Sequence, residues 1–206
     1  MTSKKALLLV DLQNDFCPNG ALAVKEGDQV IPIANELKSH FEHVIASKDW
    51  HPSDHTSFVD NHPGHKLFEL ISLNGIPQVL WPAHCVQHSK GSEFHPTLQQ
   101  SGIEKIIYKG TDKNIDSYSV FFDNAHLKDT ELNNYLHSLG VEEIYIMGLA
   151  TDYCVKYTAL DAVKLGYKVY VIEDGCRGVE REEGDAAKAI SEMRDVGVEI
   201  INSADV

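Results

Sequence analysis

Short runs of apolar residues recur along the chain, separated by longer stretches with helical spacing. The runs predict strands at 6–10, 43–47, 103–108, 141–147, 167–172 and 198–201. Between them, apolar residues recur every three or four positions from 30 to 41 and from 132 to 139, which predicts helices with one buried face. Gly140, Gly166 and Gly197 follow predicted helices at places suited to a left-handed helix end.

Alternation of strands and helices predicts an α/β fold. The expected architecture has three layers, a mostly parallel six-stranded sheet with helices on both faces. The run at 6–10 is continuously apolar, as a strand buried on both faces requires. A length of 206 residues suits one domain, so we expect residues 1–206 to form a single unit.

The segment from about 50 to 100 does not follow this alternation. Residues 51–96 hold five of the seven prolines and seven of the eleven histidines. Long loops in compact domains are usually lids or binding loops, or else are disordered. Phe58, Phe68 and Trp81 argue against disorder, so we interpret this segment as a metal-binding excursion from the sheet.

Composition and charge limit the kinds of binding partner and the cellular compartment that we expect. With 43% hydrophobic and 24% charged residues, the chain has the composition of a globular protein. Its formal charge of -13 disfavours nucleic acid and acidic membranes as partners. Four scattered cysteines without a CxxC pair predict free thiols in a reducing compartment. The first apolar run is too short for a signal peptide or membrane span, so we expect a cytoplasmic protein.

The candidate reactive residues come directly after the predicted strands in the sequence. Asp11 comes after the first strand, Asp49 after the second, Lys109 after the third and Cys154 after the fourth. Ligands of open parallel sheets bind at the carboxyl ends of the strands, so these four side chains should share one edge. Taken singly, each has an ordinary explanation as a turn residue, a solvated lysine or a small buried thiol.

Cys154 is the predicted nucleophile. It lies where an apolar strand passes into a helix that Thr151 or Asp152 could cap. Unpaired N–H groups of the first helical turn and the nearby Lys109 would favour the thiolate. Asp11 would take and return the proton, and the backbone N–H groups of Ala150 and Cys154 would hold the oxyanion of an acyl-transfer intermediate.

A metal site is predicted at Asp49-Trp-His51-Pro. In an extended segment, residues two apart point to the same side and can share an ion. His84 is the preferred third ligand, because His55 and the other histidines of the segment have weaker contexts. One divalent ion is expected, with zinc preferred over iron or manganese. The alternative is that these histidines only form hydrogen bonds within loops.

Aromatic residues near these groups could form a small flat pocket. The candidates for its walls are Phe16, Trp81 and Tyr118. Aromatic side chains mostly pack in cores, so the prediction of these wall residues has less support than the predictions for the polar site residues.

Taken together, the motifs resemble those of the nicotinamidases, also called pyrazinamidases, within the isochorismatase-like cysteine hydrolases. The matching segments are residues 6–16, Asp49-Trp-His51-Pro, Trp81-Pro-Ala-His84-Cys-Val, Tyr108-Lys109-Gly, Asp116-Ser-Tyr118-Ser and Gly148-Leu-Ala-Thr-Asp-Tyr-Cys154-Val. The aspartate, lysine and cysteine motifs are shared by the wider superfamily, whereas the two histidine motifs point to nicotinamidases.

The resemblance implies hydrolysis of nicotinamide to nicotinate and ammonia, with pyrazinamide as a further substrate. It implies a catalytic triad of Asp11, Lys109 and Cys154, and a metal bound by Asp49, His51 and His84 that positions the pyridine ring. A fourth protein ligand varies within the family, and His55 is the candidate for it here. It further implies the isochorismatase-like hydrolase fold and a cis peptide between Leu149 and Ala150.

Two other functions stay open at this point. One is a different amidohydrolase of the superfamily that acts on carbamoyl or ureido compounds with the same thiol. The other is a metal-binding or thiol-redox module without turnover. The lack of CxxC disfavours redox chemistry, and simple metal binding leaves Asp11 and Lys109 unexplained. Homo-oligomerisation is also left open.

Overall fold

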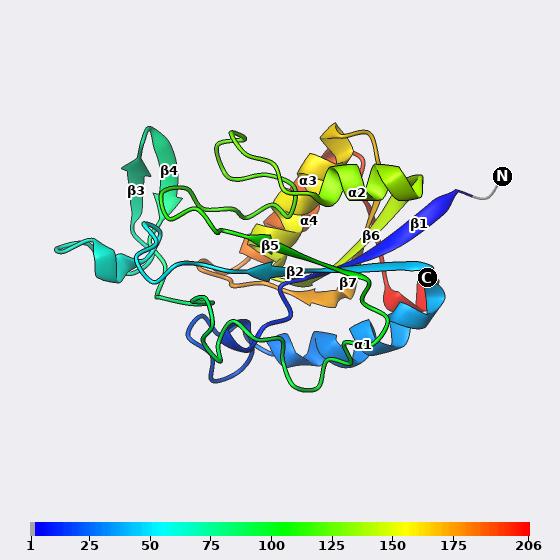
Figure 1. The fold of residues 1–206 in the computed structure, drawn as a ribbon, viewed down its shortest axis with the longest axis horizontal. Helices are drawn as coiled ribbons and strands as arrows, with labels where there is room; N and C mark the ends of the chain where they lie inside the picture. Colours follow the sequence, from blue (N-terminus) through cyan, green and yellow to red (C-terminus); the bar gives the residue numbers. More distant parts are fainter. Residues whose placement is uncertain (1–2) are drawn as a thin grey trace.

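The computed structural model describes residues 3–206 and has the predicted α/β architecture (Figure 1). Six strands form one sheet in the order β5-β2-β1-β6-β7-β8, and every neighbouring pair is parallel. Their bounds are β1 Lys4–Val10, β2 His43–Asp49, β5 Lys105–Lys109, β6 Val141–Leu149, β7 Lys168–Arg177 and β8 Glu199–Ile201. The fold prediction is therefore confirmed, although β7 is longer than its apolar run suggested.

Helices cover both faces of the sheet. They are α1 Val30–Leu37, α2 Leu132–Leu139, α3 Lys156–Lys164 and α4 Asp185–Asp195. Helix α1 lies on one face, and α2, α3 and α4 lie on the other (Figure 1). Helix α2 ends at Gly140, whose φ of 70° is the left-handed conformation expected there.

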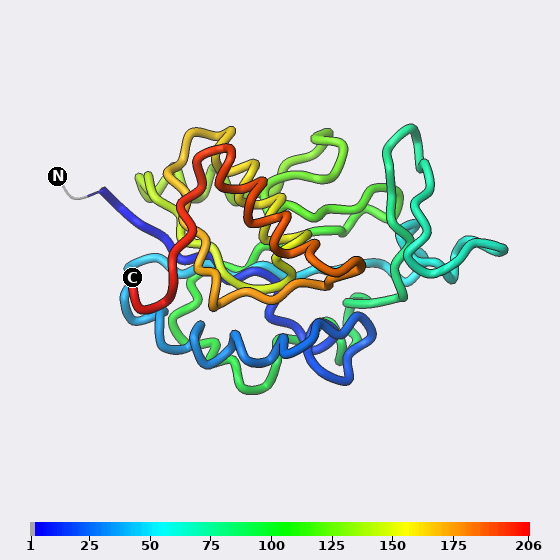
Figure 2. The backbone as a smooth tube through the Cα atoms, turned by 180° about the vertical axis from the view of Figure 1, so that it is seen from behind, coloured from blue at the N-terminus to red at the C-terminus, as the bar shows by residue number. Residues whose placement is uncertain are grey.

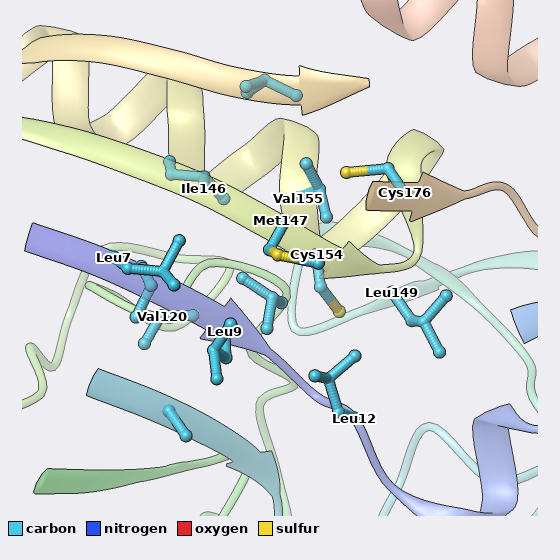
Figure 3. Close-up of a cluster of buried hydrophobic side chains, with 14 of the residues drawn as sticks. Leu7, Leu9, Leu12, Val120, Ile146, Met147, Leu149, Cys154, Val155 and Cys176 are labelled. Atoms are coloured by element: carbon cyan, nitrogen blue, oxygen red, sulfur yellow. The ribbon is translucent and has the colours of Figure 1, made fainter. Parts of the chain in front are cut away.

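The core lies around β1, the central strand between β2 and β6. Residues 6–10 are buried, and Leu7 pairs in register with Val44 of β2 and Tyr145 of β6. Figure 3 shows part of this apolar cluster, to which β1, β6 and the turn that carries Cys154 contribute side chains. The candidate residues at the strand ends are thus attached to the closely packed core of the molecule.

The strand order reverses direction next to β1. From β1 the chain builds outward through β2 to β5, then returns to β6 and builds outward on the other side through β7 and β8. In open parallel sheets such a reversal leaves a crevice at the carboxyl ends of the adjoining strands. The ends of β1, β2, β5 and β6 therefore meet at one place.

The histidine-rich excursion contains a hairpin that the sequence analysis missed. Strands β3 Leu70–Leu73 and β4 Ile76–Val79 form a two-stranded antiparallel sheet that projects from the main body (Figure 2). Asn74 and Gly75 form its turn with φ values of 51° and 82°. An Asn-Gly pair between apolar residues is a strong hairpin signal that could have revealed it. The hairpin lies at the end of the molecule away from both termini (Figure 1).

All four cysteines are unpaired and buried, which agrees with the prediction of free thiols. Within residues 3–206, no helix combines the length and the apolar character needed to cross a bilayer.

Candidate active site

The four strand ends bring the predicted reactive side chains together. Asp49 ends β2 and Lys109 ends β5, and the two are partners in the parallel register. Asp11 follows β1 directly, and Cys154 lies in the turn after β6. All four side chains are buried. Their common edge was predictable because each follows a parallel strand, whereas their pairwise contacts were not.

Lys109 is the centre of this group. Its Nζ lies 2.9 Å from Asp11 Oδ2, contacts Asp49 Oδ1, and lies 3.4 Å from Cys154 Sγ. It also donates a hydrogen bond to the Ser117 carbonyl at 3.0 Å. Burial alone would lower the pKa of Lys109, but the two carboxylates raise it well above its usual range. Lys109 is therefore a fixed cation beside the sulfur.

Asp11 is placed to exchange a proton with Cys154. Ser47 Oγ donates to Asp11 Oδ1 at 2.6 Å, whereas Oδ2 accepts no hydrogen bond of good geometry despite its contact with Lys109. Polar atoms of Asp11, Asp49 and Cys154 lie within 4.8 Å of one another. Burial raises the pKa of Asp11, with Lys109 opposing the rise. A carboxylate whose pKa is raised is a stronger proton acceptor than an exposed aspartate.

Burial opposes the predicted preference of Cys154 for the thiolate. Burial raises the pKa of Cys154 well above its usual range; Lys109 lowers it, while Asp11 and Asp49 raise it further. The sequence analysis counted the cation and the helix start but not the desolvation of the sulfur or its two anionic neighbours. A raised pKa favours the thiol, so a base is needed to take the Cys154 proton.

Cys154, the predicted nucleophile, lies in a π-helical turn, Thr151–Val155, that leads into α3. The predicted side-chain cap by Thr151 or Asp152 is wrong, because neither caps the helix. Asp152 instead accepts hydrogen bonds from the backbone of Val179 and Glu180, both at 2.9 Å. The Leu149–Ala150 peptide is cis, as the resemblance implied.

The predicted metal ligands also converge. Asp49 Oδ2 lies 3.4 Å from His51 Nε2 and 3.6 Å from His84 Nε2. The Nδ1–H of His51 donates to the Gly110 carbonyl at 2.9 Å, and that of His84 to the Pro82 carbonyl at 2.8 Å. Both rings therefore direct an Nε2 lone pair toward Asp49.

This donor set fits a divalent cation. His51 Nε2 is buried and has no hydrogen-bond partner. Carboxylate and imidazole donors suit zinc. A histidine that binds a metal through one ring nitrogen typically donates its other N–H to a group such as a backbone carbonyl, as His51 and His84 do. Burial lowers the pKa of His51, but Asp49 and Asp116 raise it and prevail, so protons would compete for the same nitrogen. A Cβ on Gly110 would lie only 2.3 Å from the His51 ring, which explains the glycine.

Two neighbours extend this cluster. Asp116 Oδ1 lies 4.0 Å from His51 Nε2, and the sequence analysis gave Asp116 no metal role. The centre of the His55 ring lies 4.3 Å from that of His51, and the two rings are tilted at 46°. His55 Nδ1 lies 2.7 Å from Ser57 Oγ, its Nε2 is buried without a hydrogen-bond partner, and burial lowers the pKa of His55 to about 4. When Nδ1–H donates to Ser57 Oγ, Nε2 keeps its lone pair, and ligand atoms of His51, His55 and Asp116 lie within 4.8 Å of one another. The role of His55 as fourth ligand stays a prediction.

Gln13 is a further site residue that sequence reasoning missed. Its side-chain amide donates to the carbonyls of Asp49 and Ser92 at 2.8 and 3.0 Å, and its oxygen accepts from Asp49 N at 2.8 Å. Gln13 thus ties the loop after β1 to the end of β2 and to the excursion. Its position in the segment Asp11-Leu-Gln-Asn-Asp was the only signal.

The predicted aromatic residues line a narrow pocket in front of the sulfur. Phe16, Trp81 and Tyr118 contribute to its walls, together with Ala150 and Cys154. Trp81 Nε1–H donates to the Tyr118 hydroxyl at 3.1 Å, which fixes the two rings at 89° to each other. The structure brings together every predicted site residue, but it does not assign their roles.

Comparison with known proteins identifies the family. A family model described as "Isochorismatase domain" matches residues 5–205. The chain belongs to the isochorismatase family. The match covers nearly the whole chain, including every predicted site residue.

Several relatives of this chain are nicotinamidases. The chain is 51% identical over 205 residues to a nicotinamidase of Escherichia coli, a match that covers 98% of this chain and 96% of the relative. A solved nicotinamidase and pyrazinamidase of Acinetobacter baumannii superposes with a TM-score of 0.96 at 46% identity, over 100% of this chain and 99% of that one. The resemblance stated from the motifs is confirmed.

A third relative was solved with a metal. A pyrazinamidase of Pyrococcus horikoshii in complex with zinc superposes with a TM-score of 0.78 at 37% identity, over 97% of this chain and 99% of that one.

Proposed function

We propose that this isochorismatase-family protein is a nicotinamidase that hydrolyses nicotinamide to nicotinate and ammonia and also accepts pyrazinamide. One observation carries the proposal: the Cys154 thiol, the Asp11 carboxylate and the Lys109 ammonium meet beside the Asp49, His51 and His84 cluster. A nucleophile and a general base next to a preformed metal-ligand set suit cleavage of an amide on a metal-binding heterocycle. The named relatives support this substrate.

Asp49, His51 and His84 would hold the metal, with zinc the proposed ion and iron or manganese as alternatives. The zinc-bound relative supports zinc. When bound, the ion supplies a Lewis acid that can hold the pyridine nitrogen directly or through water. Asp116 would add negative charge on the same side.

In the first half-reaction, Asp11 accepts the Cys154 proton while the sulfur attacks the carboxamide carbon. A C–S bond forms, and the C=O electron pair moves onto oxygen. The N–H groups of Ala150 and Cys154 would stabilise this oxyanion, and Lys109 would stabilise the neighbouring negative charges. Asp11 is needed as proton acceptor because burial raises the pKa of the Cys154 thiol.

The tetrahedral intermediate then breaks its C–N bond. Asp11 returns the proton to the leaving nitrogen, which departs as ammonia and leaves a thioester on Cys154. Asp11 next accepts a proton from water, whose oxygen attacks the thioester carbon. Breakage of the C–S bond releases nicotinate, and the proton on Asp11 restores the thiol.

The aromatic walls would hold the ring in the orientation that brings the carboxamide to the sulfur. Phe16, Trp81 and Tyr118 are the proposed contacts. Orientation of this kind contributes roughly 7–11 kcal/mol to barrier lowering in favourable cases.

An assay of both products tests the proposal. Purified protein loaded with zinc is incubated with nicotinamide, and ammonia and nicotinate are measured, with a ureido compound as competing substrate. Equal release of ammonia and nicotinate supports the proposal. Turnover of the ureido compound alone assigns a different amidohydrolase, and loaded protein that turns over neither substrate is a binding module.

A further inference from the structure

Two tyrosines separate the narrow inner pocket from a larger outer one. Tyr118 and Tyr153 line both pockets. The outer pocket has a volume of about 330 Å³ and lies between the β3–β4 hairpin and the start of α3. The inner pocket lies on the other side of the tyrosines, against Cys154. The two tyrosines therefore form a partition between the outside and the nucleophile.

The inner pocket is too small for its proposed ligand. Its volume is about 20 Å³, and a site of about 10–15 Å³ is what one water needs. Cys154, Trp81 and His84 at its walls are all buried. A pyridine carboxamide can enter only if part of the aromatic wall moves.

Arg181 fastens that wall from outside. Its Nη2 donates to the Phe68 carbonyl at 2.8 Å, and its Nη1 to the Tyr153 hydroxyl at 3.3 Å. The guanidinium carbon also lies 5.9 Å from the centre of the Phe68 ring. One side chain thus joins the excursion to the turn that carries the nucleophile.

Both partners of Arg181 pack directly on the wall of the inner pocket. The Trp81 ring lies 5.8 Å from Phe68 and 4.8 Å from Tyr153, in edge-to-face contacts with both. Tyr153 in turn lies 5.3 Å from Tyr118. Release of Arg181 would therefore loosen Phe68 and Tyr153 against Trp81, while the Trp81–Tyr118 hydrogen bond stays in place.

The segment next to Arg181 in the chain is itself held in place by hydrogen bonds. Asp152 holds the backbone of Val179 and Glu180, and the Glu180 side chain accepts hydrogen bonds from Gly184 N and Ala186 N at 2.7 and 3.0 Å. The guanidinium is planar and carries several donors, so it can hold two acceptors at once. Movement is then expected on the side of the excursion, around Phe68.

We propose that Arg181 is a positioning residue that latches the aromatic wall of the inner pocket and sets how readily a heteroaromatic carboxamide enters and is held. It touches no reacting atom and acts through Tyr153 and Phe68. The proposal rests on the proposed function for its ligand, whereas the latch itself can be tested without substrate.

Access to Cys154 is the first test, on the full-length protein. The rates of reaction of Cys154 with a bulky maleimide and with iodoacetamide are compared by peptide mass spectrometry, since their ratio cancels any change in thiol pKa. We expect Arg181→Gln to raise the bulky-to-small ratio about fivefold, the population change from one ordinary hydrogen bond. Lys188→Gln is the matched control, because it removes a charge from the same outer pocket without a contact to Phe68 or Tyr153.

Steady-state kinetics is the second test. Arg181→Gln should raise KM for nicotinamide about fivefold without lowering kcat, again from the loss of one hydrogen bond, and Arg181→Lys should be intermediate. An unchanged labelling ratio overturns the latch, as does a lower unfolding midpoint that accounts for the faster labelling. If nicotinamide is not turned over but the labelling ratio still rises, the proposed function fails and the latch stands.

Discussion

Burial sets the resting state of the reactive residues. The Cys154 thiol and the Asp11 carboxyl both have raised pKa values because desolvation disfavours their charged forms. Asp49, by contrast, has its pKa held well below the usual range: Lys109, His51 and His84 overcome the effect of burial. One aspartate is therefore suited to proton transfer and the other to holding a cation.

The raised pKa of Asp11 has a consequence for the pH profile. Asp11 must be ionised to accept the thiol proton, so kcat/KM should fall as pH drops through a pKa that lies above 3.8. Ser47 donates to the ionised form, so Ser47→Ala should raise this pKa further and move the acid limb up by about one pH unit. The measurement is kcat/KM against pH at saturating metal.

Ser92→Ala is the control for this shift. Its hydroxyl is buried nearby but donates to Ser89 rather than to Asp11. An acid limb that stays in place in Ser47→Ala, or moves to lower pH, would show that Asp11 does not control it.

Strand ends explain which site features the sequence could predict. Asp11, Asp49, Lys109 and Cys154 were predicted to meet because parallel strands align their carboxyl ends. The contact of Lys109 with both aspartates depends on register and side-chain rotamers, which no spacing specifies. The burial that raises the pKa of Cys154 was not predictable for the same reason, since it depends on the whole packed structure.

The sequence analysis missed other features of the structure, either because it did not use a signal that the sequence contains or because the sequence contains none. The β3–β4 hairpin had a readable Asn-Gly turn within a segment interpreted only as a loop. Gln13 had no chemical signature, because a glutamine that binds backbone groups resembles any polar loop residue. The hydrogen bond from Arg181 to the Phe68 carbonyl joins residues 113 positions apart, and a sequence alone does not pair them.

Gln13 gives a prediction about how the elements are joined. Gln13→Leu keeps most of the side-chain volume but leaves the backbone N–H and C=O of Asp49 buried without their partner. We expect a loss of roughly 2–6 kcal/mol in the free energy of unfolding, since each of these two unpaired buried groups costs about 1–3 kcal/mol. Denaturant unfolding measures the stability, and calorimetric zinc titration should show weaker binding.

Gln87→Leu is the comparison for Gln13→Leu. Gln87 donates one hydrogen bond to the Trp50 carbonyl in a half-buried position, so its loss should cost less and leave zinc binding unchanged. Equal effects of the two variants on zinc affinity would remove the positioning role of Gln13.

Charge balance over the whole buried cluster favours a bound cation. Asp11, Asp49 and Asp116 are three buried acidic groups, and Lys109 is the fixed cation among them. A divalent ion would complete the balance, as buried charges generally require partners. The cytoplasmic location, the absence of nucleic-acid and membrane partners, and the oligomeric state stay predictions.

Removal of the metal tests the role of the cation in the whole molecule. Treatment with a chelator should abolish ammonia release, and zinc should restore it, because the ring loses its anchor beside the sulfur. The apo protein should also unfold at a lower temperature, by the free energy of metal binding. Metal content is measured by elemental analysis. Full activity in protein shown to be metal-free would contradict the role of Asp49, His51 and His84.

The central claim is that Cys154 is the nucleophile of an amide hydrolysis, and ammonia release by zinc-loaded Cys154→Ala tests it most directly. Cys176→Ala removes a buried thiol outside the pocket and serves as the fold control. The account predicts that Cys154→Ala loses activity by about 10⁴-fold or more, as other enzymes do without their nucleophile, while Cys176→Ala stays active. Activity of Cys154→Ala within a few-fold of the wild type would contradict it.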